Sequence, residues 1–259
     1  TVWVNDPDVL STESVRAKTY AGYHLNRIEV NGTRVENPSA TVPANTSIMY
    51  YYDEDPDITI TYVVAVEEGD TAHGKVTVSA ASTSPANLES SETLAPVTAT
   101  AKGSTAVPAE GYRFVQWTDE TGRPVSDKAA FVPNRVNGLN VAATYKAHFA
   151  KCGDLKYEVH YFYENPAARA DYVENEALKK VVTDAVFESD IPYATDETKW
   201  NKRTYVFEKI EGATKVSVNA DDNILNVYYA LDELGETDPK DDTKKNPDRA
   251  DGIPDKYQI

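Results

Sequence analysis

The residue types that carry most enzymatic chemistry are few and scattered in this sequence. None of the four histidines, His24, His73, His148 and His160, belongs to an H-E-x-x-H zinc motif. The sequence contains no G-x-S-x-G nucleophile motif and no glycine-rich phosphate loop. The single cysteine, Cys152, follows His148 by four residues, but the two straddle the end of an expected strand, which argues against a Cys–His nucleophile. The sequence therefore predicts a protein that is not an enzyme.

Carboxylates offer a second kind of chemistry, because calcium prefers several oxygen ligands held by a short loop. The best cluster lies in the C-terminal tail and consists of Asp248, Asp251 and Asp255, with Asn246 nearby. Pro247 and Arg249 occupy positions where further ligands would be needed. Two interpretations stay open, a calcium site or a solvated acidic linker. We expect no other cofactor, and we expect "DEDPD" at 53–57 to be a solubilising hinge.

Aromatic side chains offer a third kind of chemistry, stacking against sugars. "EGYRFVQWTDETGRPV" at 110–125 contains Trp117, which strand alternation places on the face opposite Phe114. "KYEVHYFYEN" at 156–165 places Tyr157, Tyr161 and Tyr163 on one face. The candidate ligand-binding residues are Trp117, Tyr157 and Tyr161. The competing interpretation is that these rings pack in cores, as aromatic residues at strand spacing usually do.

Composition limits the class of protein. The 259 residues include 42 acidic and 26 basic side chains, for a net charge of −16, which argues against a nucleic-acid partner. No apolar run approaches the roughly 20 residues of a membrane span. One cysteine excludes an internal disulfide. The 17 tyrosines suit half-buried strand surfaces, so we predict mostly β structure.

Turn signals and a repeated pattern predict how the chain is organised. The segment 21–55 reads as three strands with a hairpin at Asn31-Gly32. The segment 205–233 has the same outline, and "NTSIMYYYDED" can be laid over "DNILNVYYALDE", which indicates an internal repeat. In the second copy, "ENEALKKVVTDAVF" predicts a helix because apolar residues recur at helical spacing, at Leu178, Val181, Val182, Ala185 and Val186.

We therefore predict a mostly β fold with one short helix, built from tandem small β modules. One strand, a helix and three strands indicate a β-grasp-like module at the C-terminal end. The predicted boundaries are a whole or partial β-grasp-like module at 1–56, an all-β module at 57–150, a β-grasp-like module with the helix at 151–234, and an acidic linker at 235–259.

Three features together resemble Gram-positive bacterial cell-surface repeat proteins. "YEVHYFYEN" with "VYYALDE" resembles a MucBP-type (mucin-binding-protein-like) β-grasp repeat. "AEGYRFVQWTDETG" and "LNVAATYKAHF" are similar to the GY-x-F-x-x-W strand and closing A-x-F of InlB B-repeat-like domains. "DGIPDKYQ" resembles the acidic linker between such repeats. The resemblance implies an extracellular, cell-wall-attached rod used in adhesion, and it implies no defined ligand.

These observations favour a monomeric, non-catalytic stalk or adhesion segment whose partners are mucin, host glycans or matrix proteins. Two alternatives stay open, a dedicated mucin- or glycan-binding module and an accessory region of an extracellular hydrolase. The strand-like start "TVWV" predicts a fragment of a longer protein, with the wall anchor outside this sequence. Lys–Asn isopeptide bonds are known in such surface proteins, but the sequence singles out no pair.

Overall fold

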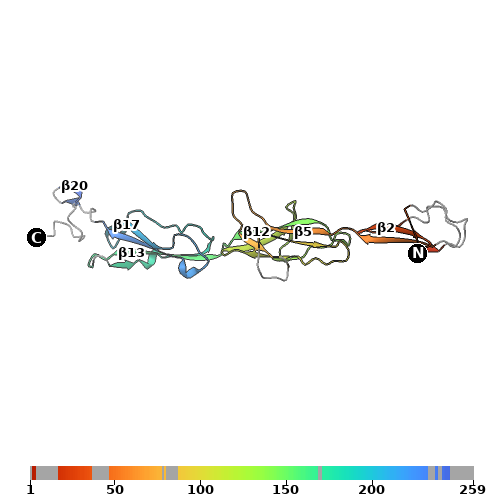
Figure 1. The fold of residues 1–259 in the computed structure, drawn as a ribbon. Coiled ribbons are helices and arrows are strands. Elements are labelled where there is room, and N and C mark those ends of the chain that lie inside the picture. Colours follow the sequence, from red (N-terminus) through yellow and green to blue (C-terminus); the bar gives the residue numbers. More distant parts are fainter. Residues whose placement is uncertain are drawn as a thin grey trace. The chain divides into compact units, whose positions relative to one another are not determined.

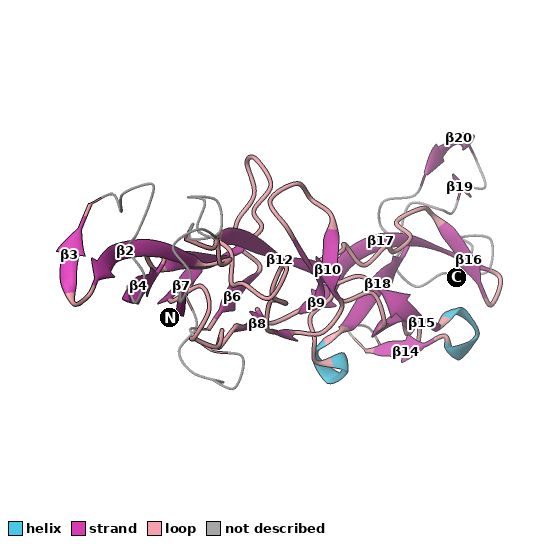
Figure 2. Ribbon diagram, turned by 90° about the vertical axis from the view of Figure 1, so that its right-hand side faces the viewer, coloured by secondary structure: helices cyan, strands magenta, loops and turns pink. Residues whose placement is uncertain are grey.

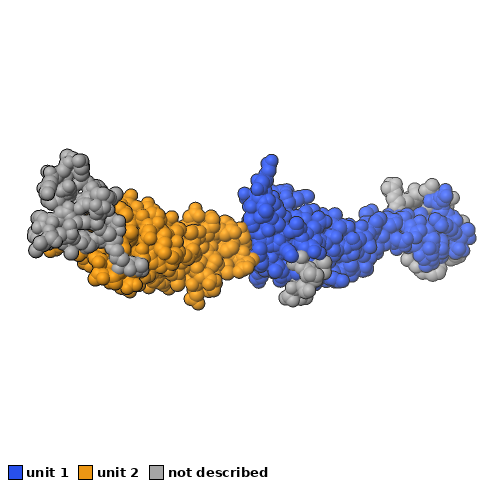
Figure 3. Space-filling view, turned by 60° about the vertical axis from the view of Figure 1, so that its left-hand side comes forward, with its two compact units in different colours: residues 1–109, 114–150 blue, residues 110–113, 151–259 orange. Residues whose placement is uncertain are grey.

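The computed structural model describes residues 2–3, 17–36, 47–77, 79, 87–168, 171–232, 237–238 and 241–245. The chain forms two compact units, residues 1–109 with 114–150 (unit 1) and residues 110–113 with 151–259 (unit 2) (Figure 3). Strands dominate both units, and the only helical elements of the described residues are two 3-10 turns of three residues each (Figure 2). The prediction of a mostly β fold of tandem small β modules is confirmed.

The N-terminal sheet of unit 1, whose strand β2 is labelled in Figure 1, has four strands in the order β1-β4-β2-β3, all antiparallel. They are β1 (Val2–Trp3), β2 (Tyr23–Val30), β3 (Thr33–Val35) and β4 (Ser47–Glu54). The predicted hairpin joins β2 to β3, and its turn residues Asn31 and Gly32 both have positive φ, 48° and 78°, as a type I′ turn requires. The core of this sheet is small, with Ile28 and Ile48 buried.

The central module of unit 1 packs a five-stranded sheet against a three-stranded sheet. The five-stranded sheet, in the order β10-β9-β12-β5-β7, contains β5 (Ile58–Val64), β7 (Glu89–Leu94), β9 (Tyr112–Thr118), β10 (Pro124–Ser126) and β12 (Ala143–Lys151). The other sheet contains β6 (Gly74–Val76), β8 (Ser104–Pro108) and β11 (Ala130–Phe131). The buried cluster includes residues of both sheets, so the core lies between them.

Unit 2 contains a sheet in the order β14-β13-β18-β17-β16, and β15 also pairs with β13. The strands are β13 (Leu155–Glu164), β14 (Tyr172–Glu174), β15 (Lys180–Ala185), β16 (Thr198–Trp200), β17 (Arg203–Gly212) and β18 (Ile224–Leu231). The 3-10 turns are η1 (Glu176–Leu178) and η2 (Ala220–Asp222). The first and last strands, β13 and β18, lie side by side and parallel, which is a β-grasp-like arrangement.

The predicted helix over the segment 174–187 is wrong. The segment forms η1 and then β15, whose Val181 and Val182 pair with Glu158 and Tyr157 of β13. β-branched valines favour a strand, and pairing satisfies the backbone groups at the edge of β13. Only Val182 and Ala185 of the apolar stripe meet the core of unit 2, whereas Leu178, Val181 and Val186 are exposed.

The tail contains one further pair of strands, β19 (Thr237–Asp238) and β20 (Asp241–Lys245), which are antiparallel. The rest of the segment 235–259, for which a linker was predicted, lies outside the described residues.

The pairing register confirms the predicted internal repeat for two of its three strands, whereas the strand expected after Glu211-Gly212 is absent, since residues 213–223 form only an isolated bridge and the turn η2. In β2, Leu25 and Arg27 face Tyr52 and Tyr51 of β4, and the register shifts between them. In β17, Phe207 and Lys209 face Tyr229 and Tyr228 of β18 with a shift at the same place. A bulge of this kind is a local feature of the fold rather than a defect. The correspondence places Tyr23, Tyr51 and Tyr52 where unit 2 has Tyr205, Tyr228 and Tyr229.

The central module shares its strand arrangement with unit 2, which the sequence comparison of the two Tyr-rich segments missed. Its first and last strands, β5 and β12, are parallel neighbours, as β13 and β18 are, and β9 lies beside β12 as β17 lies beside β18. One backbone hydrogen bond after the last strand recurs in all three copies. It joins Asp55 N to Gly22 O (2.8 Å), Cys152 N to Gly111 O (2.8 Å), and Asp232 N to Thr204 O (3.0 Å).

Candidate ligand-binding groove

Trp117 belongs to the core of the central module. Its side chain has no exposed surface, and its Nε1 donates a hydrogen bond to the carbonyl oxygen of Ala129 (3.0 Å). Its ring lies 6.0 Å from that of Tyr62 and 5.7 Å from that of Phe131, centre to centre. A ring buried in this way packs the fold and offers no surface to a ligand, in agreement with the core interpretation of the sequence.

The expected separation of Phe114 and Trp117 onto opposite faces is wrong. Their ring centres lie 6.1 Å apart in one cluster. Trp117 and Thr118 are adjacent and both buried, so β9 is covered on both sides at this end. Alternation assumes a regular strand, whereas the contact between these two rings places both in the core between the two sheets.

The tyrosines of β13 differ in accessibility although they share a face. Tyr157 and Tyr163 are 5% and 1% exposed and belong to the core cluster of unit 2. Tyr161, between them, is only half-buried and lines a groove. Of the three residues named from the sequence as ligand-binding candidates, Tyr161 alone has an accessible ring.

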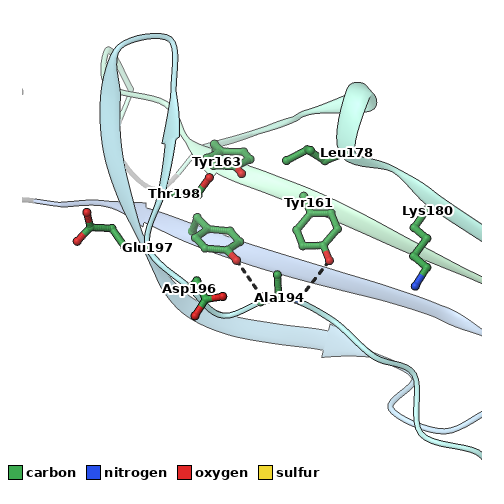
Figure 4. A pocket seen from close by; sticks show the side chains of 9 residues that line it. Tyr161, Tyr163, Leu178, Lys180, Ala194, Asp196, Glu197 and Thr198 are labelled. Atoms are coloured by element: carbon green, nitrogen blue, oxygen red, sulfur yellow. Dashed lines mark hydrogen bonds between the residues drawn. The ribbon is translucent and has the colours of Figure 1, made fainter.

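The groove lies on the core-facing side of β13 and β18 (Figure 4). Tyr161 and Tyr163 of β13 and Tyr229 of β18 line it, and Leu178 of η1 and Lys180, the first residue of β15, line it from another side. The chain from Ala194 to Thr198 forms the opposite wall, carrying Asp196 and Glu197. Its volume of about 340 Å³ is near the lower end of small-ligand sites, which suggests a ligand the size of one ring.

Two tyrosine hydroxyls hold the wall of the groove. Tyr229 donates to the carbonyl oxygen of Ala194 (2.8 Å), and the hydroxyl oxygen of Tyr161 accepts from the amide of Ala194 (3.3 Å), as the dashed lines in Figure 4 show. Burial, with smaller effects of Tyr163, Tyr161 and Asp196, raises the pKa of Tyr229 to about 12. Tyr229 is therefore neutral at physiological pH, and the aromatic rings are positioned before any ligand arrives.

The polar groups of the groove stand at its rim. The side chains of Asp196 and Glu197 are exposed on one wall, and that of Lys180 is exposed on the other. An apolar floor with a few polar groups around it is the usual composition of a small-ligand site. A sugar ring could place its apolar face on Tyr161 while its hydroxyls donate to the carboxylates and accept from the ammonium group. The same groups do not form a nucleophile with a base.

A charged cluster on the other face of β13 was not predicted. Lys156 and Lys179 donate to the carboxylate of Glu158 (2.5 and 2.9 Å), and these hydrogen bonds lower the pKa of Glu158 to about 2. His160 lies between Glu174 (2.5 Å) and Glu158 (3.2 Å). Alternation in "KYEVHYFYEN" already places Glu158 and His160 on one face. No local sequence pattern predicts that Glu174 and Lys179 of other elements contact them.

The other residues considered from the sequence either hydrogen-bond within the fold or lie outside the described residues. His148 hydrogen-bonds to Thr118 (2.9 Å) rather than to Cys152, whose backbone amide bonds to Gly111. Asp248, Asp251 and Asp255 lie outside the described residues, and within the part of the chain that is described no group of three His, Cys, Asp or Glu side chains is placed so as to hold a metal ion.

The acidic run at 53–57 is an anchored segment and not a simple hinge. The carboxylate of Glu54 accepts hydrogen bonds from the amides of Val97 and Thr98 (2.5 and 2.9 Å) and from the hydroxyl of Thr98 (2.8 Å). Asp55 pairs with His24 at 3.1 Å. Burial raises the pKa of Glu54, but these hydrogen bonds outweigh it and the net shift is downward.

Comparison with known proteins finds a family match for one part of the chain. Residues 62–151 match the family described as divergent InlB B-repeat domain, and no curated protein and no solved structure is significantly similar to the chain. None of the helices in the described residues is long and apolar enough to cross a membrane. InlB B-repeat domains are typical of extracellular surface proteins. The match therefore identifies residues 62–151 as similar to a non-catalytic repeat of bacterial surface proteins.

Proposed function

We propose that this chain is a non-catalytic stalk or adhesion segment of a cell-wall-attached bacterial surface protein. The observation that carries the proposal is a repeated pair of neighbouring strands, which the same backbone hydrogen bond closes at three places along the chain, one of them at the end of the InlB B-repeat match. Repeats with separate cores fit a protein whose task is to extend or to present binding surfaces. Each of the four histidines hydrogen-bonds to another side chain, as His148 does to Thr118.

The mechanism of adhesion in this proposal is multivalent. Mucin, host glycans and matrix proteins are long molecules that present the same groups many times. Weak contacts made by several modules, or by many copies on one cell, add through effective concentration without any single strong site.

The test compares two formats of the whole chain, a monomer in solution and an array coupled to beads at high density. Each is titrated with mucin, with collagen and with neutral host-type oligosaccharides. We expect the array to retain mucin or collagen at least about 100-fold more strongly than the monomer. Equal weak binding in both formats would contradict the multivalent mechanism. No binding in either format would exclude the adhesion role and leave the stalk function.

A second candidate function, a glycan-binding module, is favoured by the groove around Tyr161. Its half-exposed ring is held by Ala194, and exposed polar groups surround an apolar floor. The expected ligand is a neutral sugar ring of an oligosaccharide, which suits a site with acids on one wall and a lysine on the other. Unlike the multivalent mechanism, this function requires saturable binding by the monomer.

Variants of the groove separate the two functions. Tyr161→Ala removes the stacking ring and Asp196→Asn removes a charge, and each is expected to weaken monomer binding by about tenfold. Tyr161→Phe keeps the ring and is expected to bind nearly as the unmodified chain does. Tyr20→Ala, a change at an exposed tyrosine of unit 1, is the matched control. Monomer binding that Tyr161→Ala leaves unchanged would exclude the groove.

A further inference from the structure

The wall of the groove that η1 and the first residue of β15 form presents two different side chains. The backbone of Lys179 is extended, with φ −53° and ψ 128°, so its neighbours Leu178 and Lys180 both point to the groove side of the chain. Lys179 points to the opposite side, where it donates to Glu158 (2.9 Å). An apolar group and a cationic hydrogen-bond donor therefore lie next to each other on this wall.

Backbone hydrogen bonds hold this wall beside Tyr161. The amide of Asn175 donates to the carbonyl oxygen of Tyr161 (2.8 Å), and the amide of Leu178 donates to the carbonyl oxygen of Asn175 (2.9 Å). Lys180 is the first residue of β15 and pairs with Val159 of β13. The backbone of the wall is therefore in place before a ligand binds, which lowers the entropic cost of binding.

The exposed leucine of this wall is a contact surface for an apolar group. Leu178 is 45% exposed and lies outside the core cluster of unit 2. In the view of Figure 4, Leu178 lies beside Tyr161, and Tyr161 lies between Asp196 on one side and Lys180 on the other. A ligand that lies on the Tyr161 ring therefore meets carboxylates at one edge, and an ammonium group together with an apolar side chain at the other.

We propose that the groove recognises a sugar ring that carries an acetamido group, an N-acetylhexosamine. This inference rests on the glycan-binding function proposed above and names the sugar. The methyl of the acetamido group packs on Leu178, and its carbonyl oxygen accepts a hydrogen bond from the ammonium group of Lys180. The apolar face of the ring covers Tyr161, and hydroxyls at the other edge donate to the carboxylates of Asp196 and Glu197.

The charges of the two walls discriminate against related sugars. An ammonium group only donates hydrogen bonds and a carboxylate only accepts them. A plain hexose has a hydroxyl in place of the acetamido group, so it leaves Leu178 without an apolar partner. A free amine at that position is cationic and is repelled by Lys180, whereas an acidic sugar is repelled by Asp196 and Glu197. The neutral amide is therefore the substituent that suits this groove.

The test titrates the whole chain, as a monomer, with three sugars that differ in one substituent. They are the trimers of chitin, of cellulose and of chitosan, which carry an acetamido group, a hydroxyl or a free amine at the same ring carbon. We expect calorimetry to show saturable binding of the chitin trimer, at least about tenfold tighter than binding of either of the other two.

Variants of the wall locate the contacts. Leu178→Ala and Lys180→Met each remove one partner of the acetamido group, and each is expected to weaken binding of the chitin trimer by about tenfold. Neither is expected to change binding of the cellulose trimer. Lys180→Arg keeps a cationic donor and is expected to bind nearly as the unmodified chain does. Val181→Ala, a change at the next residue along β15 and 48% exposed, is the matched control and is expected to change nothing.

The outcomes separate this inference from the function on which it rests. Equal binding of the chitin and cellulose trimers, abolished by Tyr161→Ala, would overturn the acetamido contact and leave the glycan-binding function in place. Tighter binding of the chitosan trimer would show that the acidic wall selects a cation, which would also overturn the inference. If the monomer bound none of the trimers, no mucin and no peptidoglycan fragments, both the inference and the glycan-binding function would be wrong.

The same experiment identifies the source of the sugar. Acetamido sugars occur in host glycans and in the glycan strands of bacterial cell walls, so mucin and peptidoglycan fragments are titrated alongside the trimers. Monomer binding that Lys180→Met weakens would support the inference with either source, and the tighter of the two ligands would identify it. Binding of either one that Leu178→Ala and Lys180→Met both leave unchanged would contradict the inference.

Discussion

The guanidinium carbon of Arg27 lies 3.8 Å from the centre of the Tyr51 ring. The hydroxyl of Tyr51 donates to Glu29 (2.9 Å), and Glu29 in turn pairs with Arg27 (3.0 Å). At the corresponding positions of unit 2, the ammonium group of Lys209 lies 5.0 Å from the centre of the Tyr228 ring. Lys209 also pairs with Glu211 at 2.8 Å. The repeat therefore preserves a cation, an aromatic ring and a carboxylate in one arrangement beside the same bulge.

The two cation–ring pairs are expected to differ in strength. A planar guanidinium in contact with a ring interacts more strongly than an ammonium group at a larger distance. Double-mutant cycles with Arg27→Gln and Tyr51→Leu, and with Lys209→Gln and Tyr228→Leu, measure each coupling by urea unfolding. We expect favourable coupling in both pairs and a larger value for Arg27 with Tyr51. A larger coupling in the lysine pair would contradict this interpretation.

Trp117 is expected to control stability rather than binding. Trp117→Ala removes a fully buried ring and its hydrogen bond to Ala129, so it should lower the free energy of unfolding of the central module by about 3–5 kcal/mol. Val115→Ala, two residues away at a 40% exposed position, should change it by less than about 0.5 kcal/mol. Chemical denaturation of both variants tests the prediction, and a small effect at Trp117 would mean that the ring is not a core residue.

Gly103 and Gly122 form a matched pair in the central module. Both have positive φ, +74° and +85°, so an alanine at either position costs about 1–2 kcal/mol of backbone energy. At Gly103 a Cβ would also stand 2.1 Å from the backbone oxygen of Phe131, whereas nothing lies within 4 Å at Gly122. Gly103→Ala should therefore destabilise the module by at least about 2 kcal/mol more than Gly122→Ala. If the two variants lost equal stability in thermal or denaturant unfolding, the backbone near Phe131 would have to move aside without an energetic cost.

Glu158 predicts a pH dependence of stability in unit 2. Its pKa falls from 4.5 to about 2 in the folded state, chiefly because Lys156 and Lys179 donate hydrogen bonds to it. A carboxyl group with a lowered folded pKa stabilises the fold above its unfolded value, and the contribution disappears as the pH falls from 4.5 toward 2. The stability difference between the unmodified chain and Glu158→Gln should therefore be full at pH 7 and shrink across that window. If the stability difference between the two proteins did not change with pH, the effect of the substitution would come from packing and not from the charge of Glu158.

The acidic tail predicts a response to calcium. If Asp248, Asp251 and Asp255 bind the ion, calcium should raise the midpoint of thermal unfolding, and a chelator should reverse the change. Asp248→Asn combined with Asp251→Asn should abolish the response. Melting curves that are identical with calcium and with chelator would leave the tail a solvated acidic segment.

Local signals in the sequence were sufficient for the Tyr-rich strands, the hairpin and the class of fold. Asn31-Gly32 determines a tight hairpin because both residues tolerate positive φ. The Tyr-rich strands after this hairpin and in unit 2 reveal the repeat, since a repeated module requires the same residue types at the same spacing. The motif around Trp117 likewise identified the InlB B-repeat resemblance, and residues 62–151 match that family.

Tertiary structure decided what depends on partners distant in the chain. The valines of β15 have a helical spacing, but they form a strand because the edge of β13 is there to pair with. Tyr157 and Tyr161 share a face and a sequence pattern, yet only Tyr161 reaches a groove, since the wall that shapes it comes from the segment around Ala194. Glu158 meets Lys179 only after the chain has passed through β14 and η1. Spacing along a strand specifies which face a side chain takes, whereas the packing of other elements determines whether that face is buried, paired or open.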